Sequence, residues 1–333
     1  TYGNEWINYS QFYYKIKIAQ NGVYRIDSAT LAAAGIPLST INPKNFQIFN
    51  KGAQQYIHVE GESDNVFNSS DFIEFYAQKN DGSLDSLLYV NSNFVPNPYY
   101  SLINDTAVYF LTWNGLTTNN RMLVDTASDF SSYIPDNYFF KDVVTEFHSE
   151  YYEGATDNVG GTDSRYTKAE GWFGAVINLG GTGNYFVNTP NIYSTGPNER
   201  IQSVVLGASK NSLLPPDHQL QIVCNSTMLV DTTFAGYEAN RFIYDVPLTT
   251  LVSGSNSFSF TSVPSTFTSN RTVVSYINVK YPHTLDLEGS SNFTMYIPEN
   301  LGQPKTFFTF TNFNSSGTIH LYDLTNAKRI KVF

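Results

Sequence analysis

The chain has few charged residues and a single cysteine. Of its 333 residues, 14% are Asp, Glu, Lys or Arg, against roughly 25% in an average globular chain. Cys224 has no second cysteine for an intrachain disulfide, and zinc sites that need several cysteines are excluded. A catalytic thiol needs a nearby histidine, but His218 lies six residues away, at the other end of one alternating segment. We therefore expect Cys224 to be a buried core residue.

Positive charge and long apolar runs are also scarce. The net charge is −10, the pI is about 4.9, and Lys and Arg are scattered without a basic run. Proteins that bind nucleic acid usually carry a basic stripe, so nucleic-acid binding and attraction to anionic lipid are disfavoured. No apolar run approaches the roughly 18 residues that a transmembrane helix needs. Thr1 is not a natural start, so we expect that a targeting segment has been removed.

The common catalytic motifs are missing from the sequence. There is no HExxH, no GxSxG, no phosphate-binding Walker loop and no dinucleotide fingerprint. The Gly-rich residues 180–183 lie between β segments, where a hairpin turn is expected rather than a phosphate cradle. Glu146, His148 and Glu150 alternate along residues 143–154, which would place them on one face of a strand. There they would form either the metal site of a hydrolase or a solvated polar face.

Aromatic residues, by contrast, are abundant. They make up 16% of the chain, with 24 Tyr and 25 Phe. Aromatic and β-branched side chains fit a pleated, half-buried surface, so this excess predicts sheets. Residues 14–26 alternate on both sides of Asn21-Gly22, a pair that tolerates the positive φ angles of a type I′ turn. We therefore predict a β-hairpin there.

Further elements follow from local signals. Asp27 and Gly35 are capping residues at either end of one short helix over residues 28–35. A second hairpin is expected around Lys51-Gly52. From residue 171 onward, turn residues recur at the short intervals of a β-sandwich. The predicted strands include residues 71–77, 84–90, 107–113, 143–154, 172–179, 203–208, 219–224, 226–230, 241–246, 257–261, 273–281, 292–297, 306–313 and 318–324.

These elements predict a mainly β, multidomain chain of antiparallel β-sandwich or jelly-roll-like domains. Residues 1–153 would form a β-rich N-terminal domain. Residues 154–285 would form a jelly-roll-like β-sandwich, beginning at a loop rich in Gly, Asp, Asn and Thr. Residues 286–333 would either complete the sandwich or form a small third unit.

Two polar loops are candidates for calcium, because Ca²⁺ takes oxygen ligands from carboxylates, amides and carbonyls. Asp64, Asn68 and Asp71 belong to the first loop, and Asp157 and Asp163 to the second. Neither loop matches a known calcium motif. Since Asp and Asn also stabilise ordinary turns, the alternative is plain turn chemistry with no cofactor.

Exposed aromatic rings could stack on sugars. Trp113 and Trp172 are the candidate ligand-binding residues, with a glycan as the ligand. The alternative is that both rings lie in the core or in cross-strand pairs, which is the usual place of Trp in a β-protein.

Five segments carry patterns that occur together in one known family. They are EWINYSQFYYKIKIAQNGVYRIDSATLAAAG, VFNSSDFIEFYA, NDTAVYFLTW, EGWFG and LYDLTNAKRIKV, at residues 5–35, 66–77, 104–113, 170–174 and 321–332. In motif and order they resemble the N-terminal, non-catalytic region of type IX secretion system sortases (PorU-like), which belong to the gingipain-type cysteine peptidases. Residues 180–280 are similar in β pattern rather than in motif.

The resemblance implies an accessory role rather than catalysis. In that family the catalytic Cys and His lie in an α/β domain after this region, so no catalytic residue is carried over to this chain. The implied partners are proteins or substrates, including the chain's own downstream peptidase domain, to which residues 286–333 would lead. The implied location is extracytoplasmic: the periplasm, the outer-membrane surface or the medium of a Bacteroidetes-type cell. The alternative is a stand-alone glycan-binding or adhesive β-sandwich protein.

Overall fold

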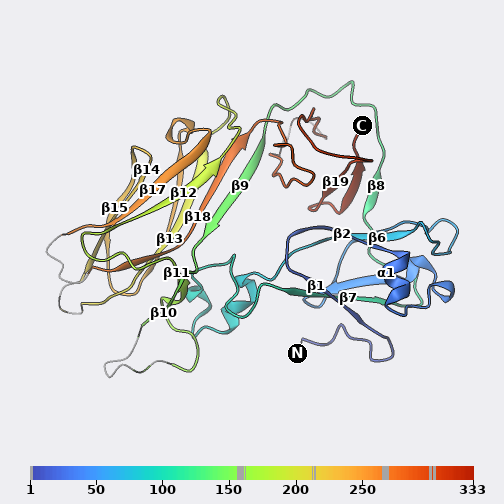
Figure 1. Cartoon of the computed structure of the whole chain (residues 1–333), viewed down its shortest axis with the longest axis horizontal. Helices are drawn as coiled ribbons and strands as arrows, with labels where there is room; N and C mark the ends of the chain where they lie inside the picture. The colour runs from blue at the N-terminus through green and yellow to red at the C-terminus, as the bar shows by residue number, and fades with distance from the viewer. Residues whose placement is uncertain are drawn as a thin grey trace. The chain divides into compact units, whose positions relative to one another are not determined.

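The structure, a computed structural model, describes residues 3–155, 161, 163–211, 213, 215–264, 270–299, 302 and 305–333. Within these residues the chain forms strands β1 to β20, the α-helix α1 and short 3-10 helices (Figure 1). Sandwich-like antiparallel sheets dominate, so the predicted mainly β fold class is confirmed. In the part of the chain that is described, no helix has the length and apolarity to cross a membrane.

Two compact units divide the chain, and neither is continuous in sequence. The first consists of Thr1–Asn80, Asn104–Asp129 and Ser315–Phe333, and the second of Asp81–Ile103 and Phe130–Asn314. Because the chain leaves each unit and returns to it, no border at a single residue can separate the two units. The borders predicted at residues 153 and 285 are therefore drawn differently from those of the units, and remain a prediction.

In the first unit two antiparallel sheets share one core. One sheet has the order β1 (Tyr14–Ile18), β7 (Ala107–Trp113), β3 (Phe46–Asn50) and β4 (Ala53–Gln54). The other has the order β2 (Gly22–Asp27), β6 (Phe72–Ala77) and β5 (Ile57–Val59). Buried residues of both sheets and of α1 (Ser28–Ala33) form one hydrophobic cluster. Asp27 caps α1 by accepting the N–H of Thr30, as its sequence predicts.

The second unit contains a β-sandwich. One sheet has the order β12 (Thr182–Thr189), β17 (Gly254–Ser262), β14 (His218–Cys224) and β15 (Thr227–Phe234). The other has the order β16 (Ala239–Val246), β13 (Glu199–Gly207), β18 (Thr272–His283) and β9 (Phe139–Glu146). Apolar residues from both sheets form the core between them. A separate pair, β10 (Glu150–Glu153) and β11 (Glu170–Phe173), accompanies the sandwich.

The predicted β-hairpin over residues 14–26 is wrong in its pairing. Both strands exist, but β1 pairs with β7 and β2 pairs with β6, so they lie in different sheets. Neither Asn21 nor Gly22 has a positive φ, and the side-chain oxygen of Asn21 accepts the N–H of Lys79. The Asn-Gly pair forms a corner between two sheets, because tertiary pairing outweighs the local turn preference.

Other local predictions had mixed outcomes. The turn at Lys51-Gly52 is confirmed: both residues have positive φ, 48° and 81°, between β3 and β4. The strand predicted at residues 84–90 is wrong, because Asp81 caps the 3-10 helix η3 (Gly82–Leu87). The strand predicted at residues 143–154 is also wrong, since it divides into β9 and β10 in different sheets. The remaining 3-10 helices are η1 (Leu38–Thr40), η2 (Pro43–Asn45), η4 (Ser92–Phe94) and η5 (Leu248–Thr250).

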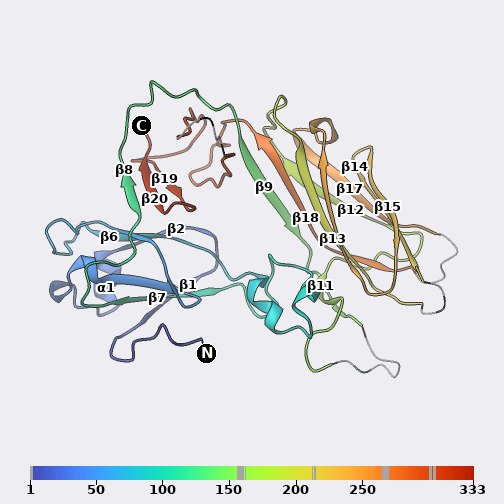
Figure 2. The ribbon, with the colours of Figure 1, turned by 180° about the vertical axis from the view of Figure 1, so that it is seen from behind.

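The C-terminal residues belong to the first unit. Strands β19 (His320–Asp323) and β20 (Lys328–Lys331) form a hairpin, and β20 pairs in parallel with β8 (Leu123–Asp125), as Figure 2 shows from behind. The strands expected at residues 292–297 and 306–313 belong to the second unit and make only isolated bridges, at Tyr296, Phe307 and Thr311.

A buried carboxylate holds this hairpin. The side chain of Glu74 in β6 is 5% exposed. Its Oε1 accepts hydrogen bonds from Arg25 at 2.5 and 2.9 Å, and its Oε2 accepts from Tyr322 at 2.5 Å and Arg329 at 2.9 Å. Burial alone would raise the pKa of Glu74, but the Tyr322 and Arg25 hydrogen bonds and the Arg329 charge outweigh it and lower that pKa. The hairpin is thus attached through charge-assisted hydrogen bonds.

We predict that Arg329→Met lowers the free energy of unfolding by about 3 kcal/mol at pH 7, because it leaves Glu74 buried with one charged partner fewer. Since the folded-state pKa of Glu74 is lowered, its contribution is present above its unfolded pKa and is lost as the pH falls through the folded value. The difference between variant and parent should therefore shrink in acid. Urea denaturation across pH measures both.

The matched control is Arg200→Met. Arg200 pairs with Asp245 at 3.0 Å, but both side chains are more than half exposed, at 56% and 61%. The control should cost less than about 1 kcal/mol. Equal losses in the two variants would mean that the Glu74 cluster contributes no more than a surface ion pair.

Candidate functional site

An open groove of about 660 Å³ lies on the first unit. Four aromatic residues line it: Trp6, Tyr13, Phe49 and Trp113. The uncharged side chains of Asn8, Ser10, Gln11, Gln47 and Asn114 also line it. Aromatic walls with a few polar groups are typical of ligand-binding pockets.

One wall of the groove is the N-terminal segment, residues 6–13. The ring of Trp6 packs against Phe49 and Phe110, with centroid distances of 5.1 and 5.4 Å. Farther along, Gln11 Nε2 donates to the carbonyl oxygen of Trp113 at 2.7 Å, and Thr112 Oγ1 donates to the carbonyl of Phe12 at 2.7 Å. These contacts fix the segment on the sheet that contains β3 and β7.

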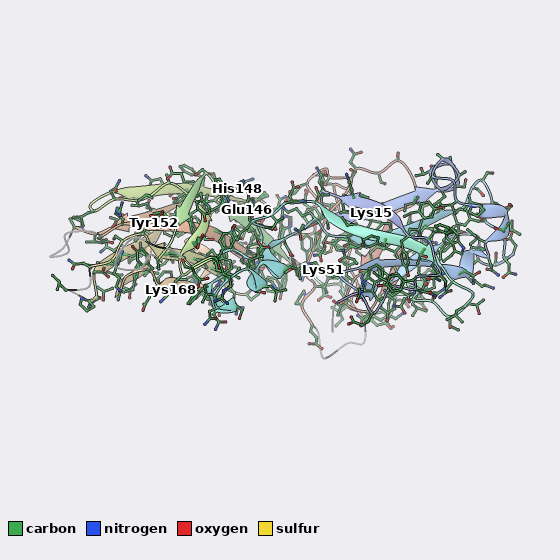
Figure 3. All side chains as sticks on the ribbon, turned by 90° about the horizontal axis from the view of Figure 1, so that it is seen from below. Lys15, Lys51, Glu146, His148, Tyr152 and Lys168 are labelled. Carbon is green, nitrogen blue, oxygen red and sulfur yellow. The ribbon has the colours of Figure 1, made fainter. Side chains whose placement is uncertain are left out.

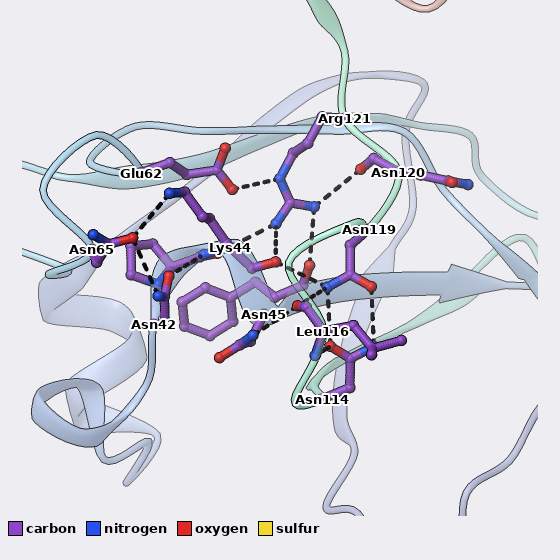
Figure 4. A network of polar contacts seen from close by, with 12 residues as sticks. Asn42, Lys44, Asn45, Glu62, Asn65, Asn114, Leu116, Asn119, Asn120 and Arg121 are labelled. Atoms are coloured by element: carbon purple, nitrogen blue, oxygen red, sulfur yellow. Dashed lines mark hydrogen bonds and ion pairs between the residues drawn. The ribbon is translucent and has the colours of Figure 1, made fainter.

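The loop after β7 also lines the groove, and a polar network holds it in place (Figure 4). Arg121 is the centre of this network: it pairs with Glu62 at 2.7 Å and donates to the carbonyl oxygens of Phe46 and Lys44 at 3.1 and 2.9 Å. Asn45 Nδ2 donates to the carbonyl of Leu116, a lining residue, at 2.7 Å. A loop held by so many bonds presents a preformed surface.

The two candidate tryptophans have different surroundings. Trp113 lines the groove, but its ring packs against the hydrophobic core of the first unit and stacks on Tyr14, with centroids 6.0 Å apart. Trp172 packs edge-on against Tyr151 at 5.6 Å and borders a void of only about 10 Å³, which has no room for a sugar ring. Ligand binding at either residue stays a prediction. Sequence reasoning missed Trp6, although it stands at the start of the first family-like segment.

The first calcium loop is internally hydrogen-bonded. Asp64 accepts the backbone N–H of Val66 at 3.0 Å and the amide of Asn68 at 3.1 Å, while Asp71 accepts the backbone N–H of Asn68 at 2.6 Å. This is turn chemistry that needs no ion. Calcium binding by Asp64, Asn68 and Asp71 stays a prediction.

The second calcium loop falls largely outside the described residues, and Asp157 is among those not described. Asp163 is described. Its carboxylate accepts the backbone N–H of Arg165 at 2.9 Å and pairs with the side chain of Arg165 at 3.4 Å. Within the described ranges, no group of three or more His, Cys, Asp or Glu side chains is placed to hold a metal ion. Calcium binding there also stays a prediction.

Glu146, His148 and Glu150 do not share one strand face. Glu146 ends β9 and Glu150 begins β10, with His148 in the connection between them (Figure 3 labels Glu146 and His148). The imidazole of His148 stacks on Tyr100, with centroids 4.5 Å apart and planes 12° apart. The strand geometry on which the metal-hydrolase alternative depended is therefore absent.

A Ser-His-Asp cluster that sequence reasoning missed lies in the second unit. His218 Nδ1 is 3.0 Å from Asp217 Oδ1, and His218 Nε2 is 3.2 Å from Ser209 Oγ. The order of contacts is that of a catalytic triad, but His218 Nε2 also lies 3.1 Å from the carbonyl oxygen of Arg271, which can only accept a hydrogen bond. Adjacent Asp and His were visible in the sequence, but nothing there placed Ser209 beside them.

This cluster is closed to substrate. Ser209, Asp217 and His218 are 5%, 1% and 0% exposed, and the imidazole stacks on Phe234 at 4.7 Å. Asp217 also accepts the backbone N–H groups of Gly236 and Asn211. Burial would raise the pKa of Asp217, but these N–H donors and His218 lower it. The cluster therefore fixes the segment before β14.

We predict that Asp217→Asn lowers the free energy of unfolding by roughly 2–4 kcal/mol at pH 7, since buried donors lose a charged acceptor. Because the pKa of Asp217 is lowered in the folded state, this difference should vanish as the pH falls through that value. Urea denaturation measures it. In the same preparations, hydrolysis of p-nitrophenyl acetate that Ser209→Ala abolishes would contradict the structural role.

Cys224 is buried at the end of β14, as predicted. Burial, and secondly the charge of Glu199, raise the pKa of its thiol to about 12. A thiol that stays protonated is a poor nucleophile. Glu199 is itself fully buried, and the backbone N–H groups of Glu199 and Leu251 lower the pKa of its carboxyl less than burial raises it. Burial raises the pKa of Glu199 to about 7.

This raised pKa has a measurable consequence. A carboxyl with a raised folded pKa stabilises fully below its unfolded pKa, and the stabilisation is lost as the pH rises through about 7. Between pH 4.5 and 7 this one group should lower the free energy of unfolding by up to roughly 1.4 kcal/mol per pH unit. We predict that Glu199→Gln removes this slope, while Glu153→Gln, at an exposed position of β10, leaves it. An unchanged slope in Glu199→Gln would contradict the assignment.

Comparisons with known proteins identify the fold. No protein-family model matches the chain. No curated protein matches it by sequence. Among solved structures, the dimeric latent PorU from Porphyromonas gingivalis is similar, with a TM-score of 0.56 and 13% identity, over 96% of this chain and 29% of that one. The likeness shows that the fold resembles part of PorU, and this chain spans less than a third of that protein's length.

Carbohydrate-binding modules of known structure are similar to the chain to a lesser degree. The CBM36-1 domain of a multidomain xylanase from the hindgut metagenome of Trinervitermes trinervoides has a TM-score of 0.25 and 9% identity, over 42% of this chain and 96% of that one. A family 35 module from Clostridium thermocellum has a TM-score of 0.23 and 16% identity, over 41% of this chain and 97% of that one. Likenesses this weak carry no functional argument.

Proposed function

We propose that this chain is the non-catalytic accessory region of a secreted or surface peptidase similar to type IX secretion sortases of the gingipain type. It would position a downstream peptidase domain and bind protein partners or substrates. The observation that carries the proposal is the likeness to part of PorU, which extends over 96% of this chain. Five sequence segments in the family's order support the same conclusion.

The chemistry of the described residues supports binding rather than catalysis. The one thiol is buried with a raised pKa, and the Ser-His-Asp cluster is closed. The groove, by contrast, is open and uncharged. The proposed location follows from the same family: periplasm, outer-membrane surface or medium.

We predict that the purified chain does not cleave peptides, because its thiol is protonated and inaccessible. A panel of fluorogenic peptides with Arg, Lys and apolar residues at the cleavage position tests this, with the Cys224→Ala variant as the matched control. Cleavage by the chain that Cys224→Ala abolishes would contradict the proposal.

The accessory role has its own test. If the gene encodes an α/β domain with a Cys/His pair after residue 333, that domain, produced separately, should co-elute with this chain in size-exclusion chromatography. A gene that ends without such a domain would refute the proposal, as would a domain that is fully active and shows no binding to this chain.

A further inference from the structure

The groove of the first unit has aromatic and polar lining residues but no charge. None of the residues that line it is Asp, Glu, Lys, Arg or His. An uncharged lining provides no selection for an ionic ligand. The aromatic residues Trp6, Tyr13 and Phe49 offer apolar surface, and Asn8 and Gln47 add amide groups. We infer that this groove binds a neutral oligosaccharide, whose C–H faces stack on the rings while its hydroxyls pair with the amides.

Hydrogen-bonding capacity remains in the groove for such a ligand. Asn8 uses its Oδ1 to accept from Ser10, and Gln47 uses its Nε2 to donate to Gln54 at 3.1 Å. In the part of the chain that is described, the Nδ2 of Asn8 and the indole N–H group of Trp6 donate no hydrogen bond, and the Oε1 of Gln47 accepts none. The groove thus offers both donors and an acceptor.

This mixture favours a sugar over a proline-rich peptide, the other common ligand of neutral aromatic grooves. A sugar hydroxyl donates and accepts, as a serine hydroxyl does, so it can satisfy every one of these groups. Proline has no N–H and cannot donate to the oxygen of Gln47.

The groove is also rigid enough to bind without ordering first. The ring of Trp6 is held against Phe49 and Phe110, and Asn45 holds the loop after β7 through the carbonyl of Leu116. Binding to a preformed site avoids the entropic cost of ordering it. The inference goes beyond the proposed accessory role and does not depend on a peptidase domain.

Gly115 allows a test that preserves these contacts. It lines the groove, and a Cβ built on it meets no atom within 4 Å. Gly115→Leu therefore adds bulk to the groove without removing a packed side chain. Gly317→Leu is the matched control, because Gly317 belongs to the same unit, has equally open space and does not line the groove.

The experiment is isothermal titration calorimetry of the whole chain with cellohexaose, xylohexaose, mannohexaose and laminarihexaose, and with decaproline and oligogalacturonate as contrasts. We expect at least one neutral hexasaccharide to bind. Gly115→Leu should weaken that binding about tenfold or more, and Gly317→Leu should leave it within about twofold. Asn8→Ala, at an exposed position, should weaken it as well.

Several outcomes would overturn the inference. They are no binding of any neutral hexasaccharide at millimolar concentration, binding of decaproline or oligogalacturonate alone, and saccharide binding that Gly115→Leu leaves unchanged. Thermal denaturation of each variant verifies folding. Loss of saccharide binding would leave the peptidase-domain interaction intact, so the two proposals can fail separately.

Discussion

The first unit depends on one buried negative charge. Glu74 lies in the middle of β6 and joins residues that are far apart in the sequence: Arg25 from β2, and Tyr322 and Arg329 from the C-terminal hairpin. A carboxylate buried to this degree is tolerated only when cations and donors surround it. The three must therefore be present together, and this requirement brings the end of the chain back to the domain that its beginning forms. The cluster thereby joins Ser315–Phe333 to the same unit, while the pairing of β7 with β1 and β3 joins Asn104–Asp129.

The same rule explains why one reactive-looking cluster is structural. Ser209, His218 and Asp217 have triad connectivity, yet their hydrogen bonds satisfy one another and the N–H groups of a buried segment. Triad geometry is what results whenever a buried Asp, His and Ser satisfy one another in series. Access decides whether such a chain of bonds can react with a substrate, and here all three side chains are buried.

The sequence predicted the strands better than their partners. Alternation located β1, β2 and β7, and Asp27 located the start of α1. The predicted pairing was wrong where a local turn signal competed with distant strands. Asn21-Gly22 favours a hairpin, but β1 pairs with β7 and β2 pairs with β6. Of the two tryptophans that line the groove, the sequence indicated Trp113 as a candidate and did not indicate Trp6. The ring of Trp6 reaches the groove only because the N-terminal segment crosses the sheet, and no local pattern encodes that crossing.

The accessible groove and the buried titratable groups of this chain lie in different places. Proton transfer needs a titratable group at the reacting atoms, with a pKa near the working pH. The lining of the groove contains no Asp, Glu, Lys, Arg, His or Cys, whereas Glu199 and Cys224, whose pKa values burial raises, are buried in the second unit. Among the described residues, the accessible groove and these two groups with raised pKa values are therefore separate. A ligand in the groove would therefore be held and oriented by uncharged groups.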